Sequence, residues 1–203
     1  MAKIRLPLFP LQVVLLPGEF LPLHIFEERY KQMIGECLKE KSPFGVVLVE
    51  REGIRKVGCT ARVTQLLERF PDGRMNILTQ GENRFEVVRI FENRPYLVGE
   101  VNFIEDAPEE PPPPGLVRQV WDAMESEERD SLPLGEEILK EPLRLSFLSA
   151  ATLRLPLPEK QTILECLSTR ERLERLLAIL EKRKELRLLL GQHQRAAERN
   201  GHP

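Results

Sequence analysis

The chain has 203 residues, of which 41% are hydrophobic and 31% are charged, and its formal net charge is -2. This length fits one large domain or two small ones, either of which is big enough to bury a core without disulfides or metals. The near-neutral net charge lacks the excess of positive charge that is typical of proteins that bind nucleic acid or an anionic membrane. No apolar run approaches the roughly 18 residues of a membrane span. Because Pro7, Pro10 and Glu19 interrupt the apolar N-terminal stretch, we expect no signal peptide and a cytoplasmic location.

Neither the cysteines nor the histidines form a recognisable chemical framework. The three cysteines, an odd number, lie far apart in sequence, which argues against a secreted disulfide scaffold. No histidine pairs with a cysteine or with another histidine at a metal-ligand spacing. The residues concerned are Cys37, Cys59, Cys166, His24, His193 and His202. We therefore expect no metal site, no cofactor and chemically inert thiols.

The N-terminal part of the chain predicts edge strands followed by a helix. Residues 1–26 are rich in proline, which cannot donate to a sheet ladder, and Pro17-Gly18 marks a tight turn. Apolar residues then recur at helical spacing, which predicts a helix over Glu27–Lys41 that ends before Pro43. From Phe44 to Val49 the chain is apolar at every position, as in a strand buried on both faces.

The next segment predicts a hairpin and a bulge. Residues 57–63 and 75–79 alternate between apolar and polar, and the turn Phe70-Pro71-Asp72-Gly73 lies between them. The alternation slips by one residue between Val87 and Val88, as at a β-bulge, and resumes cleanly over 97–103. Several short strands with bulges and turns indicate a small, strongly bent β-barrel.

A proline-rich segment divides the chain. Acidic residues lead into Pro111–Pro114, which favours an extended, semi-rigid spacer and a domain boundary. The sequence after Gly115 is helical in pattern, with the single tryptophan, Trp121, as a core anchor. The spacing from Ser168 to Glu171 is that of a capping box, so a new helix begins there. The inner face of that helix is Leu173, Leu176, Leu177 and Leu180.

A second apolar cluster follows on the same predicted helix, after a segment that is polar all round. It consists of Leu186, Leu188, Leu189 and Leu190, with Gly191 as the expected helix end. Two interpretations are open: packing against the first helix of the bundle, or a surface for self-association or a partner through Leu186, Leu189 and Leu190. The polar tail 192–203 is expected to fray.

The N-terminal motifs together resemble the N-terminal domain of the Lon protease family, which also occurs alone and at the front of cereblon. The motifs are Leu6-Pro7-Leu8-Phe9-Pro10-Leu11, Leu16-Pro17-Gly18, Leu21-Pro22-Leu23-His24-Ile25-Phe26-Glu27-Glu28-Arg29-Tyr30, Asp72-Gly73-Arg74-Met75-Asn76-Ile77-Leu78-Thr79 and Gly81-Glu82-Asn83-Arg84-Phe85. The resemblance implies an α+β fold, in which a PUA-like bent β-barrel with one or two helices precedes a helical bundle. The expected boundaries are 1–107 for the barrel, 108–115 for the spacer, 116–191 for the bundle and 192–203 for the tail.

The resemblance implies recognition of other proteins without chemistry. The nucleotide-binding string G-x-x-x-x-G-K-[ST] of a full Lon protease is absent, and no sequence remains for its Ser–Lys protease part. We therefore expect a non-enzymatic module that binds unfolded or poorly packed polypeptide, with no catalytic residue and with His24 in a structural role that holds backbone groups. The candidate binding residues are Leu16, Phe20, Leu21, Leu23 and Phe26. An equally weighted interpretation is that these residues plug the barrel end. The groove between barrel and bundle is a second candidate site.

The expected partners are polypeptide clients or a separate protease. Whether the chain also forms a homo-oligomer is left open by the sequence. One alternative function is an oligomerisation or scaffold subunit that acts through the C-terminal helices. Another is an RNA-binding PUA-like protein, which the sequence supports poorly because Arg51, Arg55 and Lys56 are followed by no aromatic stacking platform. A hydrolase is the weakest alternative. We expect neither a nucleic-acid partner nor a membrane partner.

Overall fold

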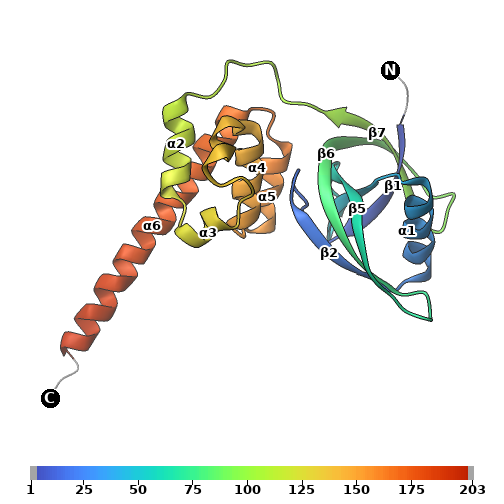
Figure 1. Cartoon of the computed structure of the whole chain (residues 1–203), viewed down its shortest axis with the longest axis horizontal. Coiled ribbons are helices and arrows are strands. Elements are labelled where there is room, and N and C mark those ends of the chain that lie inside the picture. The colour runs from blue at the N-terminus through green and yellow to red at the C-terminus, as the bar shows by residue number, and fades with distance from the viewer. Residues whose placement is uncertain (1–3, 201–203) are drawn as a thin grey trace.

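The computed structural model describes residues 4–200, and the side chains among them up to residue 190. The chain forms two lobes, a β-barrel lobe and a helical lobe, joined by one extended segment (Figure 1). Residues 105–113 form that segment and have no regular secondary structure. The fold is thus mixed α+β, with the strands first and most of the helices second, as predicted.

The barrel lobe is built from the strands β1 (Ile4–Leu11), β2 (Phe20–Ile25), β3 (Phe44–Glu50), β4 (Gly53–Ile54), β5 (Val57–Arg69), β6 (Met75–Phe91) and β7 (Leu97–Ile104). Of these, β1, β3, β5, β6 and β7 form a ring. β1 pairs with β3 in parallel and with β7 antiparallel, and the antiparallel pairs β3–β5, β5–β6 and β6–β7 complete the circle. β2 stands outside this ring and pairs with β6. The predicted bent barrel is confirmed.

Local predictions for the barrel lobe hold closely. The expected helix is α1 (Glu28–Glu40), which buries Tyr30, Met33, Ile34 and Cys37, and ends where Lys41 adopts a left-handed conformation. The β6–β7 ladder shifts register between Val87 and Arg89, so the predicted bulge is present. The turn before β6 uses Gly73 at a φ of 85°, which glycine adopts without strain.

The helical lobe begins slightly earlier than expected. Its elements are α2 (Pro114–Ala123), α3 (Ser126–Asp130), the 3₁₀ helix η1 (Gly135–Lys140), α4 (Pro142–Thr152), α5 (Leu157–Glu165) and α6 (Thr169–Asn200). α2 starts at Pro114 because proline suits the first helical position, where the backbone N–H has no partner in the helix. Trp121 is only 5% exposed, which confirms its role as a core anchor.

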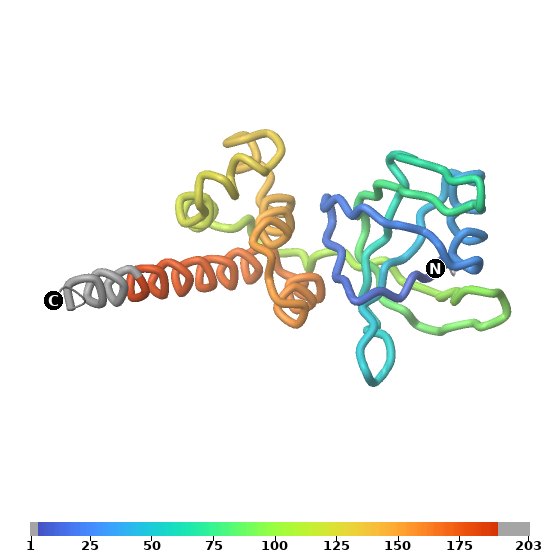
Figure 2. The backbone as a smooth tube through the Cα atoms, turned by 90° about the horizontal axis from the view of Figure 1, so that it is seen from below, coloured from blue at the N-terminus to red at the C-terminus, as the bar shows by residue number. Residues whose placement is uncertain are grey.

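The last helix, α6, starts as predicted but does not end as predicted. The Ser168 hydroxyl accepts a hydrogen bond from the backbone N–H of Glu171 at 3.0 Å, which caps the helix. Leu173, Leu176 and Leu180 are buried. The predicted stop at Gly191 is wrong, because α6 is helical through Asn200. A glycine costs a helix interior about 1 kcal/mol, which weakens a helix without ending it. Figures 1 and 2 show α6 leaving the helical lobe.

A buried charged cluster joins the two lobes. We call Arg84 of β6, Asp106 of the connecting segment and Arg172 of α6 the interlobe arginine cluster. Both guanidiniums donate to the Asp106 carboxylate and to the carbonyl of Cys166, at 2.6 and 2.8 Å for the latter. Both also lie over the ring of Phe147, at 5.3 and 4.2 Å from its centroid. Arg172 is fully buried, so these contacts are shielded from water and fix the lobes against each other.

Candidate functional site

The strand β2 presents apolar side chains to solvent at both of its ends. Phe20 begins the strand and is 57% exposed, and Phe26 follows its last residue and is 59% exposed. Successive side chains of a strand point to opposite faces, so Leu21 and Leu23 turn inward and are half-buried. Three of the five candidate residues from the sequence therefore lie in β2 and Phe26 directly follows it; Phe20 and Phe26 face outward.

Leu16 does not belong to this surface. Its side chain is completely buried, and its backbone N–H donates to the Glu19 carboxylate at 2.9 Å. The sequence placed Leu16 in the binding wall because it shares an apolar run with Phe20. The turn at Pro17-Gly18 separates the two, and the residues before that turn belong to the core.

A shallow pocket of about 560 Å³ lies beside β2, and its polar groups form a chain across three strands. Asn76 of β6 donates its side-chain N–H to the Glu68 carboxylate at 2.9 Å. Its Oδ1 therefore faces His24, 2.6 Å from Nδ1, and accepts a hydrogen bond in the tautomer that carries a proton on Nδ1. The lining residues are Pro22, Leu23, His24, Leu67, Glu68, Asn76 and Ile77.

His24 consequently differs from its predicted role. We expected its imidazole to hold backbone groups, but its partner is the Asn76 side chain, and the residue is exposed. Its ring also lies 5.9 Å from the Phe26 ring and 6.1 Å from the Phe70 ring. The imidazole thus helps to arrange aromatic side chains on this face.

A second cavity, of about 500 Å³, lies between the lobes. It occupies the position of the groove that the sequence suggested as an alternative site. Arg84 and Asp106 of the interlobe arginine cluster form part of its wall, and Leu143, which is half exposed, forms its rim. The lining residues are Pro17, Gly18, Glu82, Asn83, Arg84, Ile104, Glu105, Asp106, Leu143, Arg144 and Phe147.

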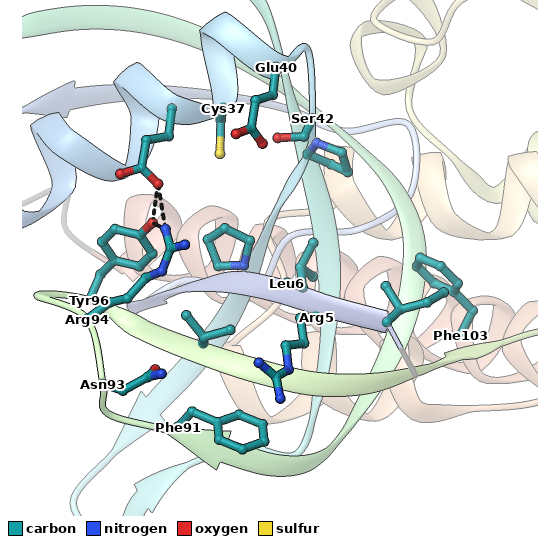
Figure 3. A pocket seen from close by; sticks show the side chains of 15 residues that line it. Arg5, Leu6, Cys37, Glu40, Ser42, Phe91, Asn93, Arg94, Tyr96 and Phe103 are labelled. Carbon is teal, nitrogen blue, oxygen red and sulfur yellow. Dashed lines mark hydrogen bonds and ion pairs between the residues drawn. The ribbon is translucent and has the colours of Figure 1, made fainter. Parts of the chain in front are cut away.

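A third cavity, of about 410 Å³, lies where β1 meets the end of α1 and the β6–β7 hairpin (Figure 3). The Glu36 carboxylate accepts hydrogen bonds from the Tyr96 hydroxyl at 2.5 Å and from Arg94 at 2.8 Å. The bond from Tyr96 helps to hold the pKa of Glu36 below its usual value. Burial raises the pKa of the Cys37 thiol, which therefore stays protonated. Sequence patterns gave no signal for this cavity, because its walls come from three separated segments.

The pKa of a second cysteine is also shifted by burial. Burial also raises the pKa of Cys59, a fully buried residue, above its ordinary value. Among the side chains that the structure describes, those of residues 4–190, no group of three His, Cys, Asp or Glu is arranged to hold a metal ion. In the same described range, none of the helices is both long and apolar enough to cross a membrane.

The second half of α6 exposes its leucines. Leu186, Leu189 and Leu190 are 56%, 48% and 55% exposed, and Leu188 is 62% exposed. The interpretation that these residues pack against the first helix of the bundle is therefore wrong. Beyond Leu180, α6 still pairs Arg183 with Glu128 and Arg187 with Glu125, but its leucines from residue 186 onward are exposed. Figure 1 shows the end of α6 extending away from the helical lobe.

Comparison with known proteins assigns the family. The model of the ATP-dependent protease La (LON) substrate-binding domain matches residues 5–182, which include both lobes. The chain belongs to the Lon substrate-binding domain family. The match covers the barrel that the sequence motifs indicated and also most of the helical lobe.

Similar proteins are full-length Lon proteases and isolated Lon N-terminal domains. Lon protease 1 of Hydrogenovibrio crunogenus is 28% identical over 185 residues, 83% of this chain and 22% of that protein. Lon protease of Parabacteroides distasonis is 34% identical over 110 residues, half of this chain. The chain thus spans about a quarter or less of the Lon proteases that it resembles.

Solved structures agree on the fold. The Lon N-terminal domain protein of Xanthomonas campestris superimposes with a TM-score of 0.70 at 28% identity, covering 86% of this chain and 98% of that one. The N-terminal domain of Lon protease from the Mycobacterium avium complex gives a TM-score of 0.66 at 17% identity, which concerns the fold alone. Both lobes of this Lon-family chain therefore follow a known arrangement.

Proposed function

We propose that this chain binds unfolded polypeptide non-covalently through the β2 surface, which we define as Phe20, Leu21, Pro22, Leu23 and Phe26. The observation that carries the proposal is the exposure of Phe20 and Phe26, each more than half accessible to solvent. Large apolar side chains grouped at one strand on a soluble protein mark an interaction site. Unfolded chains expose the apolar side chains that such a surface accepts.

The proposed role is recognition without catalysis. The family is described as substrate-binding, and its members correspond to a part of Lon proteases. Binding of this kind needs an accessible apolar surface and a rigid support, and the barrel supplies both. The clients would be unfolded segments of other proteins, passed on to a separate protease or held independently of one.

The direct test measures binding of a fluorescently labelled, reduced and carboxymethylated α-lactalbumin by anisotropy. We expect saturable binding that weakens at least tenfold in Phe20→Asp and in Phe26→Asp, because a carboxylate on the surface must be desolvated when an apolar chain binds. The matched control is Val88→Asp. Val88 is 56% exposed but lies at the bulge of β6, away from β2, and its replacement should leave binding unchanged.

Two results would remove the proposal. One is the absence of binding by the unaltered protein at tens of micromolar. The other is an equal loss in all three variants, which would indicate a general effect of added negative charge. Near-UV circular dichroism of each variant establishes that the fold is intact.

A second function is favoured by a separate observation, the exposed leucines of α6. Leu186, Leu189 and Leu190 follow the i, i+3, i+4 spacing that places side chains on one helix face. Two such helices from two copies can pair and bury this face, which would make the chain a self-associating or scaffold subunit. Sedimentation velocity should show a concentration-dependent dimer that disappears when all three leucines become glutamate. A monomer at every concentration before and after the change would exclude this function.

A further inference from the structure

The strand β2 has one free edge. Within residues 4–200 its only strand partner is β6, along which it pairs from Phe20 opposite Gln80 to Ile25 opposite Met75. β2 lies outside the barrel ring, so no other strand closes its second side. A strand edge of this kind presents backbone donors and acceptors that a further strand can use.

The direction of each backbone group along β2 follows from the ladder. The carbonyl of Glu19 accepts from the N–H of Gly81, 2.9 Å away on the β6 side. Backbone groups alternate from residue to residue in a strand, so those of Leu21, Leu23 and Ile25 face β6. Those of Phe20, Pro22 and His24 therefore face away from the sheet.

The position of Pro22 agrees with this assignment. Proline has no N–H, and within sheets it is found where that group is not required by the ladder. The free edge therefore offers the N–H groups of Phe20 and His24 and the carbonyls of Phe20, Pro22 and His24. Beyond the sheet ladders, no hydrogen bond of the described residues uses any of these five groups.

We infer that the client chain adds to β2 as an extra strand, so that recognition rests on the backbone of the client as well as on its side chains. The inference rests on the proposed function and specifies how the β2 surface would act. Strand addition uses groups that every polypeptide carries, which suits a site for clients of differing sequence. Phe20 and Phe26 lie at the two ends of this edge and would cover apolar side chains of the added strand.

The charges near the edge select a neutral apolar segment. β2 itself carries no acidic or basic side chain among Phe20–Ile25, apart from the titratable His24. The acidic residues that flank it already have partners: Glu19 pairs with Lys160 at 2.6 Å, and Glu27 pairs with Arg29 at 2.8 Å. A charged residue in the middle of an added strand would be desolvated without a counterion, so the occupant is an extended, uncharged segment of an unfolded chain.

The experiment compares His24→Pro with His24→Ala, using the same labelled, carboxymethylated α-lactalbumin. Both variants lose the imidazole, but only the proline variant also loses the outward-facing N–H. Because that N–H does not serve the β2–β6 ladder, the proline variant should keep its fold. The native strand already contains a proline at such an outward-facing position, Pro22. We expect about fivefold weaker binding for His24→Pro than for His24→Ala, the effect of one lost backbone hydrogen bond.

Amide hydrogen exchange of the unaltered protein supplies a measurement that needs no variant. The N–H groups of Phe20 and His24 should exchange rapidly in the free protein and at least tenfold more slowly when the probe is bound. Equal binding by the two His24 variants, or unchanged exchange at both amides despite saturable binding, would overturn strand addition and leave the β2 surface as an apolar contact alone. If the unaltered protein binds no probe at all, the proposed function fails as well.

Discussion

The glycine at position 81 shows how one residue of the family motif serves the fold. Its backbone N–H donates to the carbonyl of Glu19 at 2.9 Å, and its carbonyl accepts from the N–H of Gly18 at 2.8 Å. A Cβ atom at this position would lie 2.2 Å from the carbonyl oxygen of Leu16. Only glycine permits this close approach, which holds the turn before β2 against β6.

Replacement of Gly81 by alanine should lower the free energy of unfolding by more than about 2 kcal/mol, because backbone atoms must shift to admit the methyl group. Urea denaturation measures the effect. The matched control is Gly35→Ala in α1, where the added Cβ meets nothing within 4 Å. That change should raise stability by up to about 1 kcal/mol, since alanine is the better helix former. Similar values for the two variants would contradict this account of Gly81.

At the scale of elements, α6 has two parts with different environments. The first part packs against α2 and α4, and its residues Leu173, Leu176 and Leu180 are each at most 4% exposed. The end of α6 extends beyond the lobe (Figure 2). Four leucines of this second part, at positions 186, 188, 189 and 190, are exposed. One helix therefore combines a core element with an unpartnered apolar surface, and the division follows Leu180.

Alanine substitutions on the two sides of this division should differ strongly. Leu180→Ala removes buried methyl groups and leaves a cavity, so it should cost about 2 to 4 kcal/mol of stability. Leu188→Ala, at a residue that is 62% exposed, should change stability by less than about 0.5 kcal/mol. Both values come from urea denaturation at a protein concentration where the chain is monomeric. A large loss for Leu188→Ala would mean that the second part of α6 has a packing partner within the monomer.

The elements also show what sequence reasoning can reach. Helical or alternating periods correctly predicted α1, β3, the hairpin before β6 and the bulge at Val87, because each depends on neighbours in sequence. The Leu16 carbonyl lies against Gly81, and His24 bonds to Asn76; both contacts join residues more than 50 positions apart, which no local pattern records. The sequence predicts too early an end for α6, because a single glycine destabilises a helix by only about 1 kcal/mol and does not have to end it.

At the scale of the whole molecule, the interlobe arginine cluster couples the lobes electrostatically. Burial alone would raise the pKa of Asp106, but hydrogen bonds from Arg172 and Thr169 and the charges of both arginines outweigh it and hold the pKa below its ordinary value of 3.8. A carboxylate with a lowered pKa contributes stability that is present above its unfolded-state pKa. That contribution is lost as the pH falls through the lowered folded-state pKa.

The aromatic residues provide a separate optical signal for each lobe. The chain has one tryptophan, Trp121, which is buried in the helical lobe. Its two tyrosines, Tyr30 and Tyr96, are both buried in the barrel lobe. Tryptophan fluorescence therefore reports the unfolding of the helical lobe, and tyrosine absorbance, after the contribution of Trp121 has been subtracted, reports that of the barrel lobe. Because the cluster joins them, the two signals should change together in the unaltered protein.

Asp106→Asn should uncouple the lobes. At pH 7 it leaves two buried guanidiniums without a counterion, which should cost about 3 kcal/mol and separate the tryptophan and tyrosine transitions in urea. The control is Asp122→Asn, which removes a carboxylate from an exposed i, i+4 pair with Arg118 and should cost less than about 1 kcal/mol. The stability difference between Asp106→Asn and the unaltered protein should begin to shrink below about pH 3.8, where Asp106 is protonated in the unfolded chain, and should vanish only below the lowered pKa of the folded protein. Coincident transitions in Asp106→Asn, or a difference independent of pH, would show that the lobes are held together by apolar packing rather than by this carboxylate.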